Sequence, residues 1–230
     1  WFRRDTLSFM VRCPTSPHRL RWPQGKYPRL KIIAISQRVD HHPERGETRD
    51  ALDRRLVQFC FKSGFLAVPV PNFCDSGRGD PGSALQKWLE TVPFSGIILS
   101  GGNDIGSCSE RDAVEVALLQ KAREDRLPVL GICRGMQMML KQYGSTLKKV
   151  EGHVGTRHTL DGLGNGEVNS YHNYSVVGCP DAFEVTARSE DGEIEAVKHR
   201  YLRWEGWMWH PEREIQFSPQ DIERLRVLFG

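Results

Sequence analysis

One cysteine in this sequence is placed as a catalytic nucleophile would be. Cys133 lies in LGICRGMQMML (130–140), between Gly131 and Gly135, where a short apolar run gives way to helical spacing. Glycines at a strand-to-helix junction let the backbone turn sharply, so the sulfur projects from a tight elbow. The start of a helix also favours thiolate over thiol. We predict that Cys133 is a nucleophile; from this segment alone, a small buried filler remains the alternative.

A histidine and a carboxylate near the end of the sequence can serve this thiol. His210 and Glu212 lie in WMWHPE (207–212), and Pro211 favours an extended conformation for His210. Residues i and i+2 of an extended segment face the same side, so we expect Glu212 to accept the Nδ1–H of His210. The other ring nitrogen is then free to face the sulfur. Because a cysteine nucleophile needs a base and the base needs an orienting group, we predict a triad of Cys133, His210 and Glu212.

Backbone N–H groups near the cysteine can stabilise the negative charge that develops on an attacked carbonyl oxygen. The N–H of Arg134, directly after the nucleophile, is one such donor. LSGGND (99–104) offers a second, because Gly101 and Gly102 follow an apolar run and expose their N–H groups. We predict an oxyanion hole formed by Gly102 and Arg134, with a plain tight turn as the alternative for the two glycines.

Short apolar runs alternate with helical periodicity over much of the chain and must position these residues. Strands are predicted over 31–36, 65–70, 96–100 and 128–133, a loop over 37–47, and helices from Thr48 to Gly64, over 83–92, over 110–124 and from Arg134. This alternation predicts an α/β fold with a parallel sheet covered on both faces. Reactive groups collect at the carboxyl ends of the strands in such sheets, which is where Cys133 falls.

The second half of the sequence has a different pattern. Apolar runs separated by turn residues predict strands over 167–177, 182–189, 194–199 and 203–210, followed by a last helix over 219–229. We interpret these strands as an antiparallel or mixed extension that returns to the main sheet near Trp207.

Bulk composition excludes several classes of protein. The 230 residues are 39% hydrophobic and 27% charged, as in ordinary globular domains, and no apolar run approaches the length of a membrane span, about 20 residues. Six cysteines lack any C-x-x-C pair or regular spacing, which argues against a zinc cage and a disulfide framework. We therefore expect a cytoplasmic protein without a metal or other cofactor.

The amino-terminal segment differs in charge from the rest. Residues 1–31 hold eight basic residues and one acidic residue, a local charge of +7, so the remainder carries −4 of the net +3. Such a segment is compatible with an arm for nucleic acid or membrane surfaces or with an arginine-rich targeting peptide. We expect instead a poorly ordered basic leader over 1–30, a catalytic domain over 31–230 and no nucleic-acid partner.

LSGGND, LGICRGMQ and WHPE, in this order, resemble the class I glutamine amidotransferases, in particular their free-standing γ-glutamyl hydrolase branch. The resemblance implies a flavodoxin-like three-layer sandwich that attacks a γ-glutamyl amide, forms a thioester and releases glutamate. VEGHVGTRHTL and VNSYHNYSV look like substrate-side loops of that branch, where His153 and His158 match a histidine pair or are ordinary loop histidines. The resemblance implies substrate-binding roles for Gly101, Gln137, Tyr171, His172 and Asn173.

A narrower likeness concerns ISQRV, ETRDALDRRL, DGEIEAV and WMWHPER, which look like amidotransferase-type hydrolases that release a cytidine-diphosphate amidate from its γ-glutamyl adduct. Arg38, Arg45 and Arg49 would then meet a pyrophosphate, or else form a solvated charged loop.

The predicted function is hydrolysis of a small-molecule γ-glutamyl amide. The main alternative is a glutaminase subunit that supplies ammonia to a separate synthetase partner. A non-catalytic binding module conflicts with the intact triad, and an elbow-cysteine chaperone or deglycase conflicts with Arg134 directly after the cysteine.

Overall fold

The computed structural model describes residues 30–72, 81–163 and 166–230. The predicted basic leader therefore lies, except for Leu30, outside the described residues, as do Cys13 and Cys74. Among the described residues, no helix is both long enough and apolar enough to cross a membrane.

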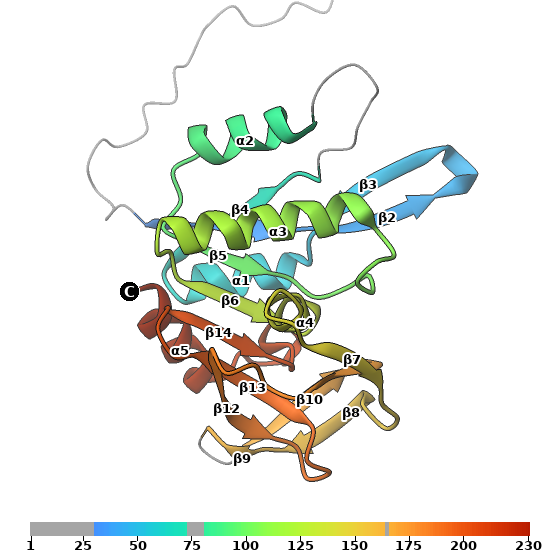
Figure 1. Ribbon diagram of the computed structural model, residues 1–230, viewed down its shortest axis with the longest axis vertical. Helices are drawn as coiled ribbons and strands as arrows, with labels where there is room; N and C mark the ends of the chain where they lie inside the picture. Colours follow the sequence, from blue (N-terminus) through green and yellow to red (C-terminus); the bar gives the residue numbers. More distant parts are fainter. Residues whose placement is uncertain (1–29, 73–80, 164–165) are drawn as a thin grey trace, which may run out of the picture.

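An eight-stranded sheet forms the centre of the molecule (Figure 1), in the order β4-β1-β5-β6-β14-β13-β12-β9. The first five strands are parallel: β4 (Phe65–Val70), β1 (Lys31–Ser36), β5 (Gly96–Leu99), β6 (Val129–Ile132) and β14 (Trp204–Trp207). The last three are antiparallel: β13 (Ile194–His199), β12 (Phe183–Arg188) and β9 (Asp161–Gly162). The predicted mostly parallel sheet with an antiparallel extension is confirmed, and the chain rejoins the parallel part at Trp207.

Helices cover both faces of the parallel strands and complete a three-layer sandwich. α2 (Pro81–Thr91), α3 (Ser109–Glu124) and α4 (Arg134–Lys141) lie on one face, and α1 (Arg54–Lys62) and α5 (Pro219–Phe229) on the other. β5 and β6 are buried at every position, as expected for strands covered on both faces. The predicted fold class is confirmed.

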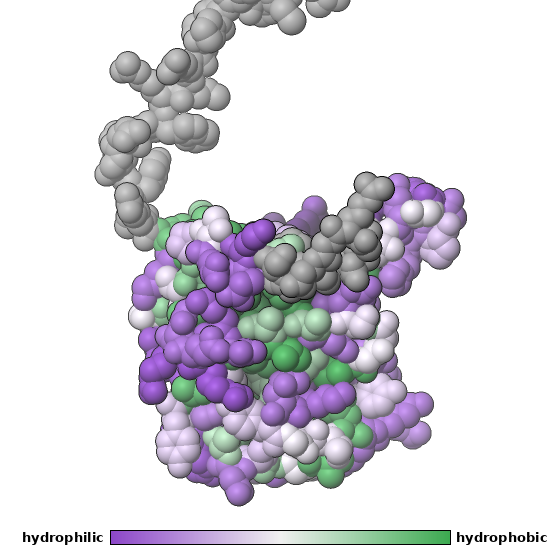
Figure 2. All heavy atoms as spheres, turned by 45° about the horizontal axis from the view of Figure 1, so that its top comes forward, coloured by the Kyte–Doolittle hydropathy of each residue, from purple (hydrophilic) through white to green (hydrophobic). Residues whose placement is uncertain are grey.

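The segment after β1 differs from its prediction. Residues predicted as a loop and a helix start form a hairpin of β2 (Arg38–His42) and β3 (Glu47–Ala51), joined by the one-turn 3-10 helix η1 (Pro43–Arg45). Gly46 closes the turn at φ 63°, a conformation that favours glycine. α1 begins only at Arg54, because the side chain of Asp53 accepts a hydrogen bond (2.8 Å) from the N–H of Arg55 and caps the helix. The hairpin extends away from the sheet (Figure 1), and its surface is largely hydrophilic (Figure 2).

Two further hairpin-like pairs lie beside the antiparallel strands. The segment 167–177, predicted as one strand, forms two: β10 (Glu167–Tyr171) pairs with β8 (Val154–Thr159), and β11 (Tyr174–Val177) pairs with β7 (Thr146–Lys149). The strand breaks at residues 172–173, where the chain changes partner. β7 and β8 were not predicted, because most of their residues are exposed and polar and show no apolar alternation.

Candidate active site

The carboxyl ends of three neighbouring strands bring the predicted site segments together. Gly101 and Gly102 follow β5, Cys133 follows β6, and His210 lies three residues after β14. Because β5, β6 and β14 are adjacent and parallel, their ends meet at one edge of the sheet. This edge is where parallel α/β sheets hold their ligands.

Cys133 sits on a strained elbow. Its φ of 51° and ψ of −106° are unusual for a residue with a side chain, and its N–H donates to the carbonyl of Trp207 at 2.7 Å. A Cβ on Gly135 would lie 2.1 Å from the carbonyl oxygen of Leu99, and one on Gly131 would lie 2.6 Å from the backbone of Gly135. Any side chain at these two positions would therefore separate α4 from β5 and β6.

His210 is buried, and its ring is held from one side by Glu212. The two side chains join through His210 Nδ1 and Glu212 Oε1 at 2.6 Å. Glu212 reaches this position from η2 (Pro211–Arg213), a one-turn 3-10 helix, rather than from the extended segment that the sequence suggested. The contact was predicted, but the backbone that produces it was not, because Pro211 starts the turn immediately after the extended His210.

The charge state of His210 links it to the cysteine. Burial alone would lower the pKa of His210, but hydrogen bonds to Cys133 and Glu212, together with the negative charges of those groups, raise its pKa to about 9. The imidazolium form is therefore favoured at neutral pH. The structure thus joins His210 to Glu212 by a hydrogen bond and places Cys133 close enough to affect the pKa of His210.

Asn169 on β10 fixes the backbone of His210. The N–H of His210 donates to Asn169 Oδ1 at 3.0 Å, and Asn169 Nδ2 donates to the carbonyl of His210 at 2.8 Å. Asn169 is itself buried. Asn169 was not predicted, and its only signal in the sequence is its position in VNSYHNYSV, two residues before Tyr171.

A buried ionic network supports the loop that follows β5. Arg111 on α3 donates to the carbonyls of Ser100 (2.7 Å), Gly101 (3.0 Å) and Gly102 (2.8 Å). The C=O and the following N–H of a trans peptide point in opposite directions, so the N–H of Gly102 faces away from α3. Arg111 is fully buried and pairs with Glu115 at 3.1 Å.

The side chain of Arg134 belongs to the same network. It forms ion pairs with Asp112 and Glu115, and Ser36 donates to Glu115 at 2.8 Å. Sequence reasoning used Arg134 only as a backbone donor. The i, i+4 spacing of Arg111 and Glu115 was a signal for an ion pair on a helix, but it gave no indication that the pair is buried under the loop.

The residues predicted to bind substrate differ in their burial and in their distance from His210. Gly101 lies under the His210 ring, and the ring of the exposed Tyr171 stands edge-on to His210 with centroids 5.9 Å apart. Gln137 is buried and donates to the carbonyl of Tyr174 at 2.8 Å. His172 is buried and Asn173 is exposed.

A cavity of about 360 Å³ opens beside α4. Gln137, which lies one helical turn after Cys133, forms part of its wall together with Lys141, Leu147 and Tyr174. A second, narrow pocket between the β2–β3 hairpin and the loop after β5 is lined by Arg38, Gly102 and His210, among others. Of the predicted triad, His210 and Glu212 therefore line the second pocket, and Cys133 lines neither.

The three arginines suggested for pyrophosphate binding do not share one location. The side chain of Arg38 lies against the loop after β5, because a Cβ on Gly102 would come within 3.2 Å of Arg38 Cδ. Arg45 and Arg49 are on the outer part of the hairpin, where they pair with Glu44 and Glu47. Only Arg38 therefore lies near the predicted triad.

Comparisons with known proteins identify the family of this chain. The model of the class I glutamine amidotransferase family matches residues 80–228. The chain therefore belongs to that family. It is 35% identical over 140 residues to a γ-glutamyl-CDP-amidate hydrolase of Campylobacter jejuni, a match that covers 58% of this chain and 69% of the relative.

Other relatives carry the name of a nucleotide synthase. A glutamine-hydrolysing GMP synthase component of Methanococcus aeolicus is 35% identical over 138 residues, which cover 56% of this chain and 70% of that protein. A crystal structure described as a GMP synthase component of Thermoplasma acidophilum aligns with a TM-score of 0.64 at 19% identity, covering 89% of this chain and 94% of the other. The latter similarity concerns the fold alone.

Proposed function

We propose that this protein hydrolyses a γ-glutamyl amide bond with Cys133 as nucleophile, His210 as general acid and base, and Glu212 as the group that orients the histidine. The observation that carries the proposal is the position of the buried His210, which is paired with Glu212 at the carboxyl edge of the sheet, where the adjacent strand β6 ends at Cys133. Membership in the class I glutamine amidotransferase family supports it.

The first half of the reaction forms a thioester. The thiolate of Cys133 attacks the γ-carbonyl carbon, and the carbonyl oxygen becomes an oxyanion near the N–H groups of Gly102 and Arg134. The C–N bond then breaks while the His210 imidazolium gives its proton to the leaving nitrogen. The raised pKa of His210, about 9, keeps this proton available at neutral pH.

The second half releases glutamate. Neutral His210 accepts a proton from water, the resulting hydroxide attacks the thioester carbonyl, and the C–S bond breaks to restore the Cys133 thiolate and His210 imidazolium. Glu212 accepts a hydrogen bond from Nδ1 throughout, so Nε2 faces the reacting atoms in both steps. Arg111 holds the carbonyls of the loop after β5 and thereby fixes the N–H of Gly102 in the proposed oxyanion hole.

We propose that the glutamyl group contacts Gly101, Gln137, Tyr171 and Asn173, and that the substrate is a γ-glutamyl nucleotide amidate. The buried ring of His172 faces Glu195 and is not among these contacts. The name of the Campylobacter relative, γ-glutamyl-CDP-amidate hydrolase, supports this substrate class. Arg38 supports it as well, because this residue lines the narrow pocket beside Gly102 and its half-exposed guanidinium, paired with Asp40 at 3.0 Å, is of the kind that meets a phosphate.

A second candidate function is that of a glutaminase component delivering ammonia to a separate synthetase. The 35% identity to one component of a GMP synthase favours this candidate. The two functions differ in the size of the leaving amine and in the need for a partner.

Rates of glutamate release from glutamine, γ-glutamyl p-nitroanilide and γ-glutamyl-CDP-amidate test the proposal. We expect kcat/KM to be highest for the nucleotide amidate without any added protein. Cys133→Ala should abolish release, whereas Cys179→Ala, at a half-buried cysteine away from the site, should not. Release by Cys133→Ala would refute the nucleophile, and turnover of glutamine alone, stimulated by an added synthetase, would favour the glutaminase.

A further inference from the structure

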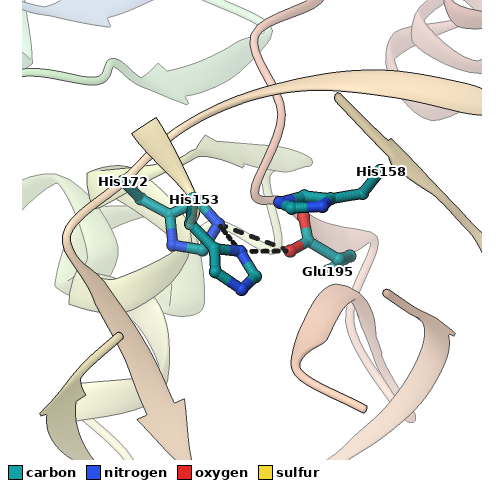
Figure 3. Close-up of side chains that lie close together, drawn as sticks. All are labelled: His153, His158, His172 and Glu195. Atoms are coloured by element: carbon teal, nitrogen blue, oxygen red, sulfur yellow. Dashed lines mark hydrogen bonds and ion pairs between the residues drawn. The ribbon is translucent and has the colours of Figure 1, made fainter. Parts of the chain in front are cut away.

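Three histidines and a glutamate converge outside the proposed triad (Figure 3). This histidine cluster consists of His153, His158, His172 and Glu195, and one ligand atom from each lies within 4.8 Å of the others. His153 precedes β8, His158 is on β8, His172 follows β10 and Glu195 is on β13. All but the half-buried His158 are removed from solvent.

The carboxylate of Glu195 lacks a partner that would account for its burial. It is fully buried, and neither of its oxygens accepts a hydrogen bond from a described residue. The neighbouring nitrogens are His172 Nε2 at 3.3 Å and His153 Nδ1 at 3.7 Å, both measured to Oε1. A buried carboxylate is costly unless a positive charge or hydrogen-bond donors compensate it, so the cluster requires a cation.

The outer contacts of two histidines fix which ring nitrogens carry hydrogen. His153 Nε2 meets Asp191 Oδ2 at 2.8 Å, and His172 Nδ1 meets the carbonyl of Tyr174 at 3.0 Å. Both oxygens are acceptors, so these nitrogens are the donors. In the neutral rings, the nitrogens left over are lone-pair atoms, yet they face each other at 3.2 Å and both face Glu195.

We propose that the histidine cluster binds one divalent transition-metal ion of the zinc type. His153 Nδ1, His172 Nε2 and Glu195 supply three ligands, and His158, whose Nε2 is buried without a hydrogen-bond partner among the described residues, supplies the fourth. Imidazole and carboxylate ligands in fourfold coordination are those that Zn²⁺ accepts.

The spacing of the ligand atoms fits this coordination. Metal–ligand distances of about 2.0–2.1 Å place tetrahedral ligands roughly 3.3 Å apart. The separations among the first three ligand atoms are 3.2, 3.3 and 3.7 Å. Asp191 and the Tyr174 carbonyl bind the far sides of the two rings, as groups in the second coordination layer of metal sites do. One divalent ion would also balance the carboxylates of Glu195 and Asp191.

Four protein ligands leave no open position, so the ion stabilises structure and does not take part in the reaction. It would tie β8 and the end of β10 to β13 of the main sheet. β10 also carries Asn169, which holds the backbone of His210. The metal is therefore expected to stabilise the position of His210 from a distance.

Titration of the chelator-treated protein with ZnSO₄ in a calorimeter tests the site, and Co²⁺ provides a spectroscopic probe through the visible bands of four-coordinate cobalt. We expect one ion per chain, the cobalt bands, and a higher Tm with Zn²⁺. Glu195→Gln and His172→Ala should each weaken binding at least about 100-fold and abolish the rise in Tm. Glu195→Gln keeps the side chain's shape and removes a buried charge, which guards against loss of folding.

Adventitious binding to surface histidines is controlled by the double variant His41→Ala/His42→Ala. Both residues lie on the β2–β3 hairpin, away from the cluster, and the variant should bind Zn²⁺ as the unaltered chain does. The proposal is overturned if the unaltered chain shows no one-to-one binding, in which case protons compensate Glu195. It is also overturned if Glu195→Gln and His172→Ala bind with unchanged affinity, or if the hairpin variant alone loses binding.

Discussion

Replacing Gly101 with alanine tests whether the position of the His210 ring determines the rate of amide hydrolysis. A Cβ at this position would lie 2.5 Å from His210 Cε1 and 3.3 Å from Nε2. Ordinary contact with a Cβ begins at 3.4 Å, so the ring must move by about 0.9 Å or the loop must retreat. The φ of Gly101 lies outside the left-handed region, so alanine adds no backbone strain of its own.

The expected effect is on catalysis more than on folding. A misplacement of about 1 Å in a catalytic group costs on the order of 100-fold in rate. Overpacking one methyl group against a side chain that can move costs about 1–3 kcal/mol of unfolding free energy. We therefore expect kcat for glutamate release to fall about 100-fold in Gly101→Ala, while Tm decreases by only a few degrees, roughly as that free energy implies for a domain of this size.

Gly166→Ala is the matched control. It is the same substitution at an exposed glycine outside the left-handed region, and a Cβ there would have no neighbour within 4 Å. Its kcat and Tm should equal those of the unaltered chain. A folded Gly101→Ala protein that keeps full kcat would show that the ring position does not limit the reaction, and would refute the role given to His210.

The remaining predictions concern charge. Activity should fall as pH rises through about 9, because His210 then loses the proton that it gives to the leaving nitrogen, and Glu212→Gln should shift this decline in a pH–rate profile to lower pH. A decline that does not move would contradict the pairing. Arg111→Met should lower the free energy of unfolding, measured in urea, by about 3–5 kcal/mol, because it leaves buried carbonyls and part of the Glu115 charge uncompensated. Lys121→Met, which breaks an ion pair at the surface, is the control. A smaller loss of stability in Arg111→Met than in this control would contradict the prediction. A glutamine-analogue electrophile should label Cys133 first by mass spectrometry, and equal labelling elsewhere would argue against its activation. Burial raises the pKa of the other described cysteines, to about 12 in Cys60 and to a smaller extent in Cys108 and Cys179.

Local patterns were sufficient to predict the strands of the central sheet other than β9, but not the small strand pairs. β1, β5 and β6 are short apolar runs bounded by turn residues, and burial on both faces gives them that composition. Apart from the buried Val39, the β2–β3 hairpin is mostly polar and exposed, so no apolar alternation marks it in the sequence. There, hydrogen bonding between the strands and the Asp53 cap set the boundaries of the elements.

In the candidate site, too, local sequence patterns predict some residues and not others. Cys133 and the His210–Glu212 pair each lie in a short motif whose residue types suggest their chemistry. Asn169 and Arg111 act through contacts with residues 41 and 9–11 positions away, respectively, and nothing in their own segments identifies those partners. The residues of the histidine cluster come from three separate elements, so no local motif indicates a metal site, and the cysteine pattern led to the expectation of none.

The two sides of the elbow at Cys133 are supported by different chemistry. On the side of β5, the fully buried Arg111 holds the loop through charge-assisted bonds to three carbonyls. On the side of β14, Asn169 of β10 holds His210 through neutral hydrogen bonds, and His172, directly after β10, lies beside Glu195 of β13. Neutral hydrogen bonds are weaker than charge-assisted ones, and β10 lies outside the main sheet. The position of His210 is therefore easier to disturb than the position of the loop after β5. A substitution in the histidine cluster should therefore affect the reaction rate by displacing His210, and not by displacing the proposed oxyanion donors Gly102 and Arg134.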